Sequence, residues 1–117
     1  MLDQKAKDLG RLIGQSPEYQ AVKRANESLH NDRDAVTSLN RMETLRQEAQ
    51  RMLAQGSEPS DEMERELDDL LTKVQGSPAY QLAISAQENF DKLMIQVNGW
   101  ISEGMKSGAA SPIITLG

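Results

Sequence analysis

The sequence has no cysteine, a single histidine and only four aromatic residues. Without cysteine there can be no disulfide, thiolate nucleophile, zinc–thiolate site or cysteine-held iron–sulfur cluster. With one histidine and no glycine-rich phosphate loop, the chain also lacks the usual ligands and motifs of metal-dependent and nucleotide-dependent enzymes. We therefore expect no catalytic residue, no cofactor site and no metal site.

Long apolar runs and excess positive charge are also missing. No run approaches the 18 or so apolar residues that a transmembrane helix needs. Because the first residues contain no apolar segment, we expect no signal peptide and a cytosolic location. The net charge of −5 argues against docking on anionic lipid and against direct nucleic-acid binding. Nucleic-acid binding would need one basic helix face, whereas the candidate residues are irregularly spaced: Lys23, Arg24, Arg33, Arg41, Arg46 and Arg51.

The chain repeats itself. Residues 8–29 align without a gap with residues 69–90, at a constant offset of 61 positions. Within this stretch, six of fourteen positions are identical between Ser16–Leu29 and Ser77–Phe90, where average residue usage predicts about one. The repeating unit is a short helix, a Ser-Pro break and a longer helix.

Apolar residues at steps of three and four predict four helices, over residues 2–13, 17–55, 61–74 and 78–106. Each long helix begins with a serine able to accept from backbone N–H groups and a proline at the first helical position. The second helix contains no proline or glycine between Pro17 and Gly56, and would be about 58 Å long. Residues 56–60 form the one clear loop.

These elements predict an all-α protein, a four-helix antiparallel bundle built from two short-helix/long-helix repeats with one very long helix. We expect a single domain over residues 1–106, with repeats at 2–55 and 60–106. Residues 107–117 form a C-terminal tail, linker-like at first and then apolar. The apolar part of this tail is a candidate docking segment, formed by Ile113, Ile114 and Leu116.

The long second helix carries the candidate interface. A stripe of apolar residues along the middle of this helix extends beyond the length that the first helix, about 18 Å long, can cover. We therefore predict that this stripe forms a homodimer or partner interface through Val36, Leu39, Met42 and Leu45. A polar patch around Asp32 interrupts the stripe and marks a bend or a recognition site. His30, Asp32 and Asp34 are too few for an ordinary metal site, which favours a bend or a solvent gap.

Other candidate residues have a functional and a structural interpretation. Glu88 and Asp91 are able to act as an acid–base pair, but they lie on a predicted solvent face. Tyr19 and Tyr80 occupy equivalent positions and are able to gate a ligand, although packing over each helix corner is the simpler explanation. The methionine stripe fits a core better than an adaptable binding groove; it comprises Met42, Met52, Met63, Met94 and Met105.

The sequence resembles the YlbF/YmcA family of small bacterial helical proteins, including its YheA-like members. The resemblance covers residues 2–107 and rests on Leu9, Gly10, Ile13, Ser16, Pro17, Glu18, Tyr19, Ser77, Pro78, Tyr80 and Phe90. It implies a non-enzymatic regulator that forms dimers or larger assemblies. It further implies a link to competence, biofilm formation and sporulation through the endoribonuclease RNase Y. Some relatives carry cysteines linked to iron–sulfur clusters, whereas this chain has none.

From the residues and the resemblance together, we predict a cytosolic protein-binding regulator or adaptor. Its expected partners are a second copy of the chain, an endoribonuclease and family paralogues, and we expect no membrane partner. The alternatives are a structural self-assembling module of unknown role and, less well supported, a small hydrolase.

Overall fold

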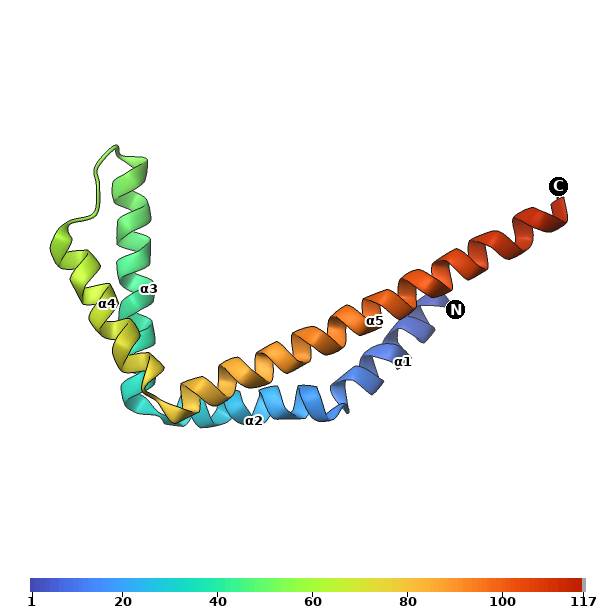
Figure 1. Ribbon diagram of the computed structural model, residues 1–117, viewed down its shortest axis with the longest axis horizontal. Coiled ribbons are helices and arrows are strands. Elements are labelled where there is room, and N and C mark those ends of the chain that lie inside the picture. The colour runs from blue at the N-terminus through green and yellow to red at the C-terminus, as the bar shows by residue number, and fades with distance from the viewer. Residues whose placement is uncertain (117) are drawn as a thin grey trace.

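A computed structural model describes the backbone of residues 1–116 and the side chains of residues 1–110. It contains five α-helices: α1 (Leu2–Gly14), α2 (Pro17–Asn31), α3 (Arg33–Ala54), α4 (Asp61–Gln75) and α5 (Pro78–Leu116) (Figure 1). No strand occurs in residues 1–116. The prediction of an all-α protein is therefore confirmed.

The predicted helix over residues 17–55 is broken at Asp32 into α2 and α3. Asp32 has extended backbone angles, φ −86° and ψ 93°, and its Oδ1 accepts the Ala35 N–H at 3.2 Å. This is an N-cap, in which a short polar side chain satisfies a free N–H at a helix start. The offset of 61 places Leu93 at the equivalent position in the second repeat, and α5 continues through it unbroken.

The very long helix is therefore α5, with 39 residues and a length of about 58 Å. We expected this helix to end near Lys106 and a separate tail to follow, but the helical backbone continues to Leu116. The side chains of Ile113, Ile114 and Leu116 lie outside the described residues, so their docking stays a prediction.

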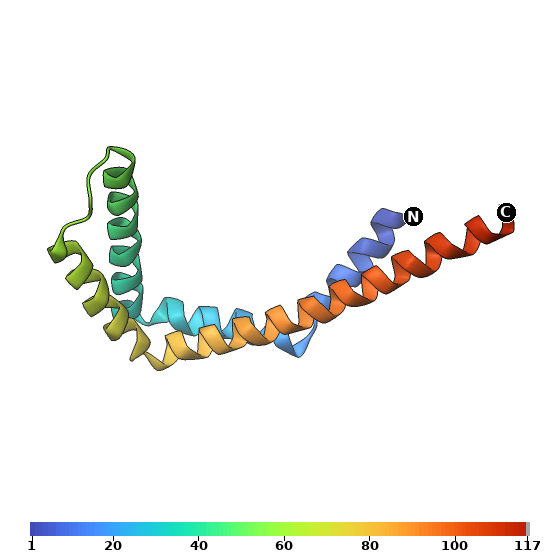
Figure 2. The same ribbon diagram turned by 45° about the horizontal axis from the view of Figure 1, so that its top comes forward.

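The structure does not show the predicted four-helix bundle. α2 runs antiparallel to α5, and α3 runs antiparallel to α4, as two pairs that meet at a sharp corner (Figures 1 and 2). The molecule measures 68 × 38 × 20 Å, with a radius of gyration of 21.6 Å; a compact domain of this length would have about 13 Å. The break at Asp32 is the physical reason, because it turns α3 away from the α2–α5 pair.

Both Ser-Pro corners are built in the same way, as the repeat predicts. Ser16 Oγ accepts the Tyr19 N–H at 3.1 Å, and Ser77 Oγ accepts the Tyr80 N–H at 3.3 Å. Each serine thus caps a helix whose first residue is proline.

At each corner, a glutamine in the first turn or two of the second helix bonds back to the end of the first helix. Gln20 Nε2 donates to the Gly14 carbonyl at 2.8 Å, and Gln81 Nε2 donates to the Gln75 carbonyl at 2.6 Å. Both bonds span six residues and satisfy a carbonyl left free at the end of the preceding helix. The two corners are therefore alike in their hydrogen bonds as well as in sequence.

The connection from α3 to α4 follows the predicted loop. Gly56 has a φ of +81°, which only glycine adopts without strain. The Ser57 N–H reaches the Met52 carbonyl at 2.8 Å and the Gly56 N–H reaches the Leu53 carbonyl at 3.1 Å. This pair of bonds is the Schellman motif that ends many helices. Ser60 then caps α4 by accepting the Met63 N–H at 3.2 Å.

The core is small and divided between the two helix pairs. Ala25, Ala83 and Ala86 form a buried cluster where α2 meets α5. Ala25 and Ala86 are equivalent residues of the two repeats, and their small side chains let the helices approach closely. In the α3–α4 pair the fully buried side chains are Leu45 and Val74.

Candidate interaction surface

The predicted interface residues do not share one environment. Val36, Leu39 and Met42 are half-buried on α3. Leu45 is only 1% exposed, so it belongs to the chain's own core and is not available on the surface. The surface part of the predicted stripe is therefore formed by the first three residues.

Two shallow grooves meet at Leu39. One, of about 190 Å³, lies at the corner between α2 and α3 and is lined by Asn26, Leu29, His30, Val36, Leu39 and Asn40. The other, of about 320 Å³, is lined by Leu39, Met42, Glu43, Arg46 and Leu67 and borders α4. We call the combined surface around Val36, Leu39, Met42 and Leu67 the α3 groove.

Two ion pairs lie on the α3–α4 pair, and the residues of one of them, Glu43 and Arg46, line the α3 groove. Arg41 Nε lies 2.6 Å from Glu66 Oε1 and links α3 to α4, while Arg46 pairs with Glu43 at 2.6 Å on α3 itself. Hydrogen bonds from these guanidinium groups lower the pKa of each glutamate. All four side chains are substantially exposed, so the two ion pairs contribute little to stability.

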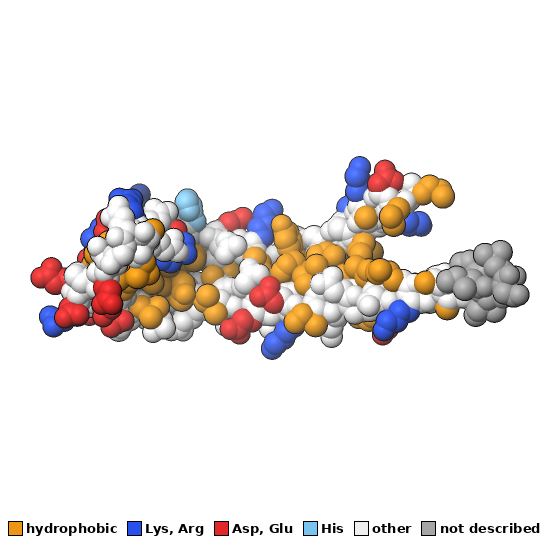
Figure 3. Space-filling model, turned by 90° about the horizontal axis from the view of Figure 1, so that it is seen from above, with side chains coloured by type: hydrophobic (Ala, Val, Ile, Leu, Met, Phe, Trp, Pro, Cys, Tyr) orange, Lys and Arg blue, Asp and Glu red, His pale blue; other side chains and the backbone are white. Residues whose placement is uncertain are grey.

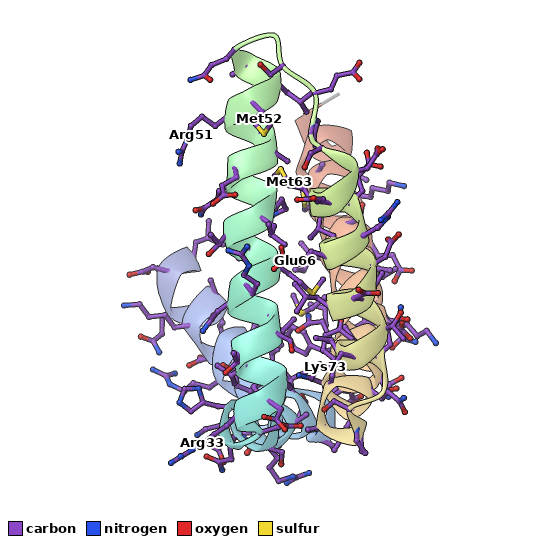
Figure 4. All side chains as sticks on the ribbon, turned by 90° about the vertical axis from the view of Figure 1, so that its left-hand side faces the viewer. Arg33, Arg51, Met52, Met63, Glu66 and Lys73 are labelled. Atoms are coloured by element: carbon purple, nitrogen blue, oxygen red, sulfur yellow. The ribbon has the colours of Figure 1, made fainter. Side chains whose placement is uncertain are left out.

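The α3–α4 pair holds two of the predicted methionines. Figure 4 shows Met52 and Met63 facing one another between the helices, with Glu66 pointing from α4 toward α3. Met42 and Met94 are also half-buried, whereas Met105 is exposed. Four of the five methionines are thus partly enclosed, and Met105 lies on an open surface.

The polar patch at Asp32 forms the bend between α2 and α3. Asp32 Oδ2 accepts a hydrogen bond from the Ser77 hydroxyl at 2.8 Å, which ties this corner to the start of α5. The Ser77 hydroxyl, followed by the Ala35 N–H, holds the pKa of the Asp32 carboxyl below its ordinary value. In the part of the chain that the structure describes, no three His, Asp or Glu side chains are grouped closely enough to hold a metal ion.

The two tyrosines differ in their contacts. The Tyr19 ring packs edge-on against Phe90 of α5, with ring centroids 5.6 Å apart. It thus contacts the other repeat, which differs from the predicted packing over its own corner. Tyr80 is half-buried beside a separate groove of about 550 Å³ that Ile84 and Ser85 also line.

The candidate acid–base residues lie apart from these grooves. Glu88 and Asp91 are exposed on α5, and the Asp91 carboxylate accepts a hydrogen bond from Gln87 at 2.9 Å. The structure therefore places them on the solvent face that the sequence predicted.

Comparison with known proteins supports the resemblance seen in the sequence. A family model described as "Control of competence regulator ComK, YlbF/YmcA" matches residues 2–106. The chain belongs to the YlbF/YmcA family. Within the described residues of this family member, no helix is both long and apolar enough to cross a membrane.

Curated bacterial relatives carry a different family name. A UPF0342 protein of Desulfitobacterium hafniense (strain Y51) is 28% identical over 102 residues, covering 87% of this chain and 78% of the relative. A UPF0342 protein of Limosilactobacillus reuteri (strain DSM 20016) is 25% identical over 97 residues, covering 83% and 79%. The similarity thus spans most of this YlbF/YmcA family member.

Sequence reasoning missed two features of the surface. The first is the bond between Asp32 and Ser77, which joins residues 45 positions apart and has no local signal. The second is the exposure of Trp100 and Met105 on α5, which the predicted bundle would have buried. The sequence held a signal for the second feature. The predicted helix 78–106 is far longer than the predicted helix 61–74 before it, which is too short to cover its whole length.

Proposed function

We propose that this chain is a non-enzymatic regulator that acts in the cytosol by binding another protein. The observation that carries the proposal is the match of a family named for control of a competence regulator over residues 2–106. Following the resemblance to YlbF/YmcA proteins, the proposed partner is the endoribonuclease RNase Y, bound together with family paralogues.

The α3 groove is the proposed partner surface. Val36, Leu39 and Met42 offer adjacent apolar side chains, and Leu39 lies where the two grooves meet. A groove lined by adjacent apolar side chains is a surface into which a partner's amphipathic helix lays its apolar face. Met42 is flexible and polarizable, which suits contact with an irregular partner surface. Leu45 of the same helix is buried, and α3 packs along α4, so the surface is presented by a fixed helix pair.

The test is a pull-down of purified RNase Y from the host organism with tagged full-length chain. We expect the wild-type chain to retain RNase Y and Leu39→Asp to lose it. Leu53→Asp is the matched control, because Leu53 is exposed near the end of the same helix and outside the groove. Met42→Ala is a milder second variant that is expected to weaken retention without unfolding the chain.

Circular dichroism must show the same helix content in each variant. If wild type, Leu39→Asp and Met42→Ala retain the same amount of RNase Y, the α3 groove is not the partner surface. No retention by the wild-type chain would contradict RNase Y as the partner.

The second candidate is a structural self-assembling module. It is supported by the elongated shape, with a radius of gyration of 21.6 Å and two small cores. In that case a pull-down from the native host recovers untagged copies of the chain and no ribonuclease.

A further inference from the structure

The chain from α2 to α5 forms one helical hairpin with a bend in the middle. α2 and α3 make its first arm, α4 and α5 make its second arm, and the loop at Gly56 joins the two arms. Seen from above, the α3–α4 pair stands end-on over one end of the α2–α5 pair (Figure 3). Within the described residues, helices of different pairs make substantial contact only where they follow one another in the chain. The two halves of the hairpin are therefore joined mainly at two crossings, residues 31–33 and 76–78.

The two crossings are hydrogen-bonded to each other. Asp32 lies at the first crossing and Ser77 at the second, both half-buried, and the Ser77 hydroxyl donates to Asp32 Oδ2 at 2.8 Å. Each of these side chains also caps the helix that follows it, through the N–H of Ala35 in α3 and of Tyr80 in α5. The bond thus joins the start of α3 to the start of α5, at the point where the hairpin bends.

The first repeat uses its equivalent serine differently. Ser16 caps α2 in the same way that Ser77 caps α5. However, the Ser16 hydroxyl donates to the Ile13 carbonyl at 2.6 Å, within its own corner, whereas the Ser77 hydroxyl donates to Asp32, 45 residues away. Because capping a helix does not require this distant partner, the bond to Asp32 has a separate structural role at the bend.

Asp32 interrupts an arm that has no other cause to break. After its first residue, the arm contains no proline or glycine before the loop. Asp32 lies three residues after Leu29 and four before Val36, so it occupies a position on the apolar stripe. An unbroken helix would bring its carboxylate into the contact between the arms, where a charge without a partner is costly. The bend avoids this cost, since the carboxylate accepts two hydrogen bonds there.

The second repeat shows the alternative at the same position. Leu93 is equivalent to Asp32, and α5 continues through it unbroken. The second crossing breaks its arm in either arrangement, because Ser77 precedes Pro78 and a residue before proline is disfavoured from helical backbone angles. The first crossing alone therefore decides whether the hairpin is bent or straight.

We propose that the corner is a hinge between a bent and a straight hairpin, and that the bond between Asp32 and Ser77 is the latch that holds it bent. In the straight form α2 and α3 join into a single helix, and the α3–α4 pair extends in line with the α2–α5 pair. Loss of one hydrogen bond to a charged group shifts the ratio of straight to bent chains by about tenfold or more.

The hinge also controls the α3 groove, a step that rests on the proposed function. The part of the groove at the corner is lined from both sides of the hinge, by Leu29 and His30 of α2 and by Val36 and Leu39 of α3. Straightening changes the angle between these helices and removes this part of the surface. A partner that binds there stabilises the bent form, and the bent form in turn binds the partner more tightly.

The test measures a distance across the corner. Because the chain has no cysteine, Leu53→Cys on α3 and Ile95→Cys on α5 place spin labels at two defined and exposed positions. Pulsed electron paramagnetic resonance gives the distance between the labels in the full-length chain. Dilution with excess unlabelled chain ensures that only two labels in the same molecule are measured. A straight hairpin separates the two positions by about 57 Å along its axis, whereas the bent hairpin holds them closer.

Three variants of the labelled chain test the latch. Asp32→Leu gives the first repeat the residue type of the second, and we expect most chains to shift to about 57 Å. Ser77→Ala removes the latch but leaves Asp32 as a cap, and we expect a mean distance between those of Asp32→Leu and the otherwise unchanged chain. Ser77→Thr is the matched control, because it keeps the hydroxyl and should keep the short distance. Ser16→Ala is the control for the stability lost with a serine cap, since it removes the equivalent cap without touching the latch.

Two distance results would overturn the proposal. A short distance in both Asp32→Leu and Ser77→Ala, at wild-type helix content by circular dichroism, would mean that packing alone holds the bend. A distance in Ser77→Thr as long as that in Ser77→Ala would mean that the hydroxyl is not the latch.

Retention of purified RNase Y by the same variants separates the hinge from the proposed function. We expect Asp32→Leu to lose retention and Ser77→Thr to keep it. If Asp32→Leu is straight and retains as much RNase Y as wild type, control of the α3 groove by the hinge is wrong. If the wild-type chain retains no RNase Y, the proposed function fails, while the distances still decide whether the hinge and its latch exist.

Discussion

Replacing Leu45 with alanine tests whether this residue belongs to the core or to an interface between chains. Leu45 is 1% exposed within a single chain, so Leu45→Ala leaves a cavity inside the α3–α4 pair. Truncation of a buried leucine costs about 3 kcal/mol of unfolding free energy. For 117 residues the entropy of unfolding is about 0.25 kcal/mol/K, which converts this loss into a fall of about 12 °C in Tm.

The assay is thermal and urea unfolding followed by circular dichroism, at two protein concentrations. Because the cavity lies within one chain, the difference in Tm between variant and wild type should be the same at both concentrations. Leu53→Ala is the control on the same helix, and its exposed side chain predicts a change within about 0.5 kcal/mol. The reasoning is refuted if Leu45→Ala is as mild as Leu53→Ala, or if its effect disappears at one concentration, as expected for an interface residue.

Three further predictions concern the corners and the helix crossing. Because hydrogen bonds from Ser77 and a backbone N–H lower the pKa of Asp32 in the folded chain, its contribution to stability is present above the ordinary carboxylate pKa. That contribution is lost as the pH falls through the lowered pKa, so Asp32→Asn should flatten the acid side of a plot of Tm against pH below about pH 4; an unchanged acid limb would contradict this. Gln20→Ala and Gln81→Ala should each cost about 1 kcal/mol in urea unfolding, and clearly unequal losses would show that the two corners are not equivalent. Ala86→Leu inserts a large side chain where α2 meets α5 and should cost about 1–3 kcal/mol; a neutral result would mean that the helices are not closely packed there.

The local features of the fold were predictable because their causes lie close together in the chain. Each Ser-Pro corner is held by hydrogen bonds that span six residues or fewer, so the same residues build the same corner twice. The loop at Gly56 follows from a glycine where the backbone needs a positive φ. The all-α class follows from apolar residues at helical spacing.

The candidate site was predictable only in part. The stripe over residues 36–45 was recognised from its spacing, but spacing does not say which neighbour covers a helix face. The structure places Leu45 against α4 and leaves Leu39 and Met42 beside open grooves. The difference comes from the position of α4, which depends on packing between distant segments.

The sequence by itself determined the two repeats, their corners and the helical nature of the chain. Tertiary structure decided the bend, because Asp32 is held by Ser77, 45 residues away, as well as by its own helix. It also decided which apolar faces stay open. α1 and α4 are equivalent in the repeat, yet only α4 finds a helix to pack against, since the bend at Asp32 brings α3 beside it while α5 runs straight past α1.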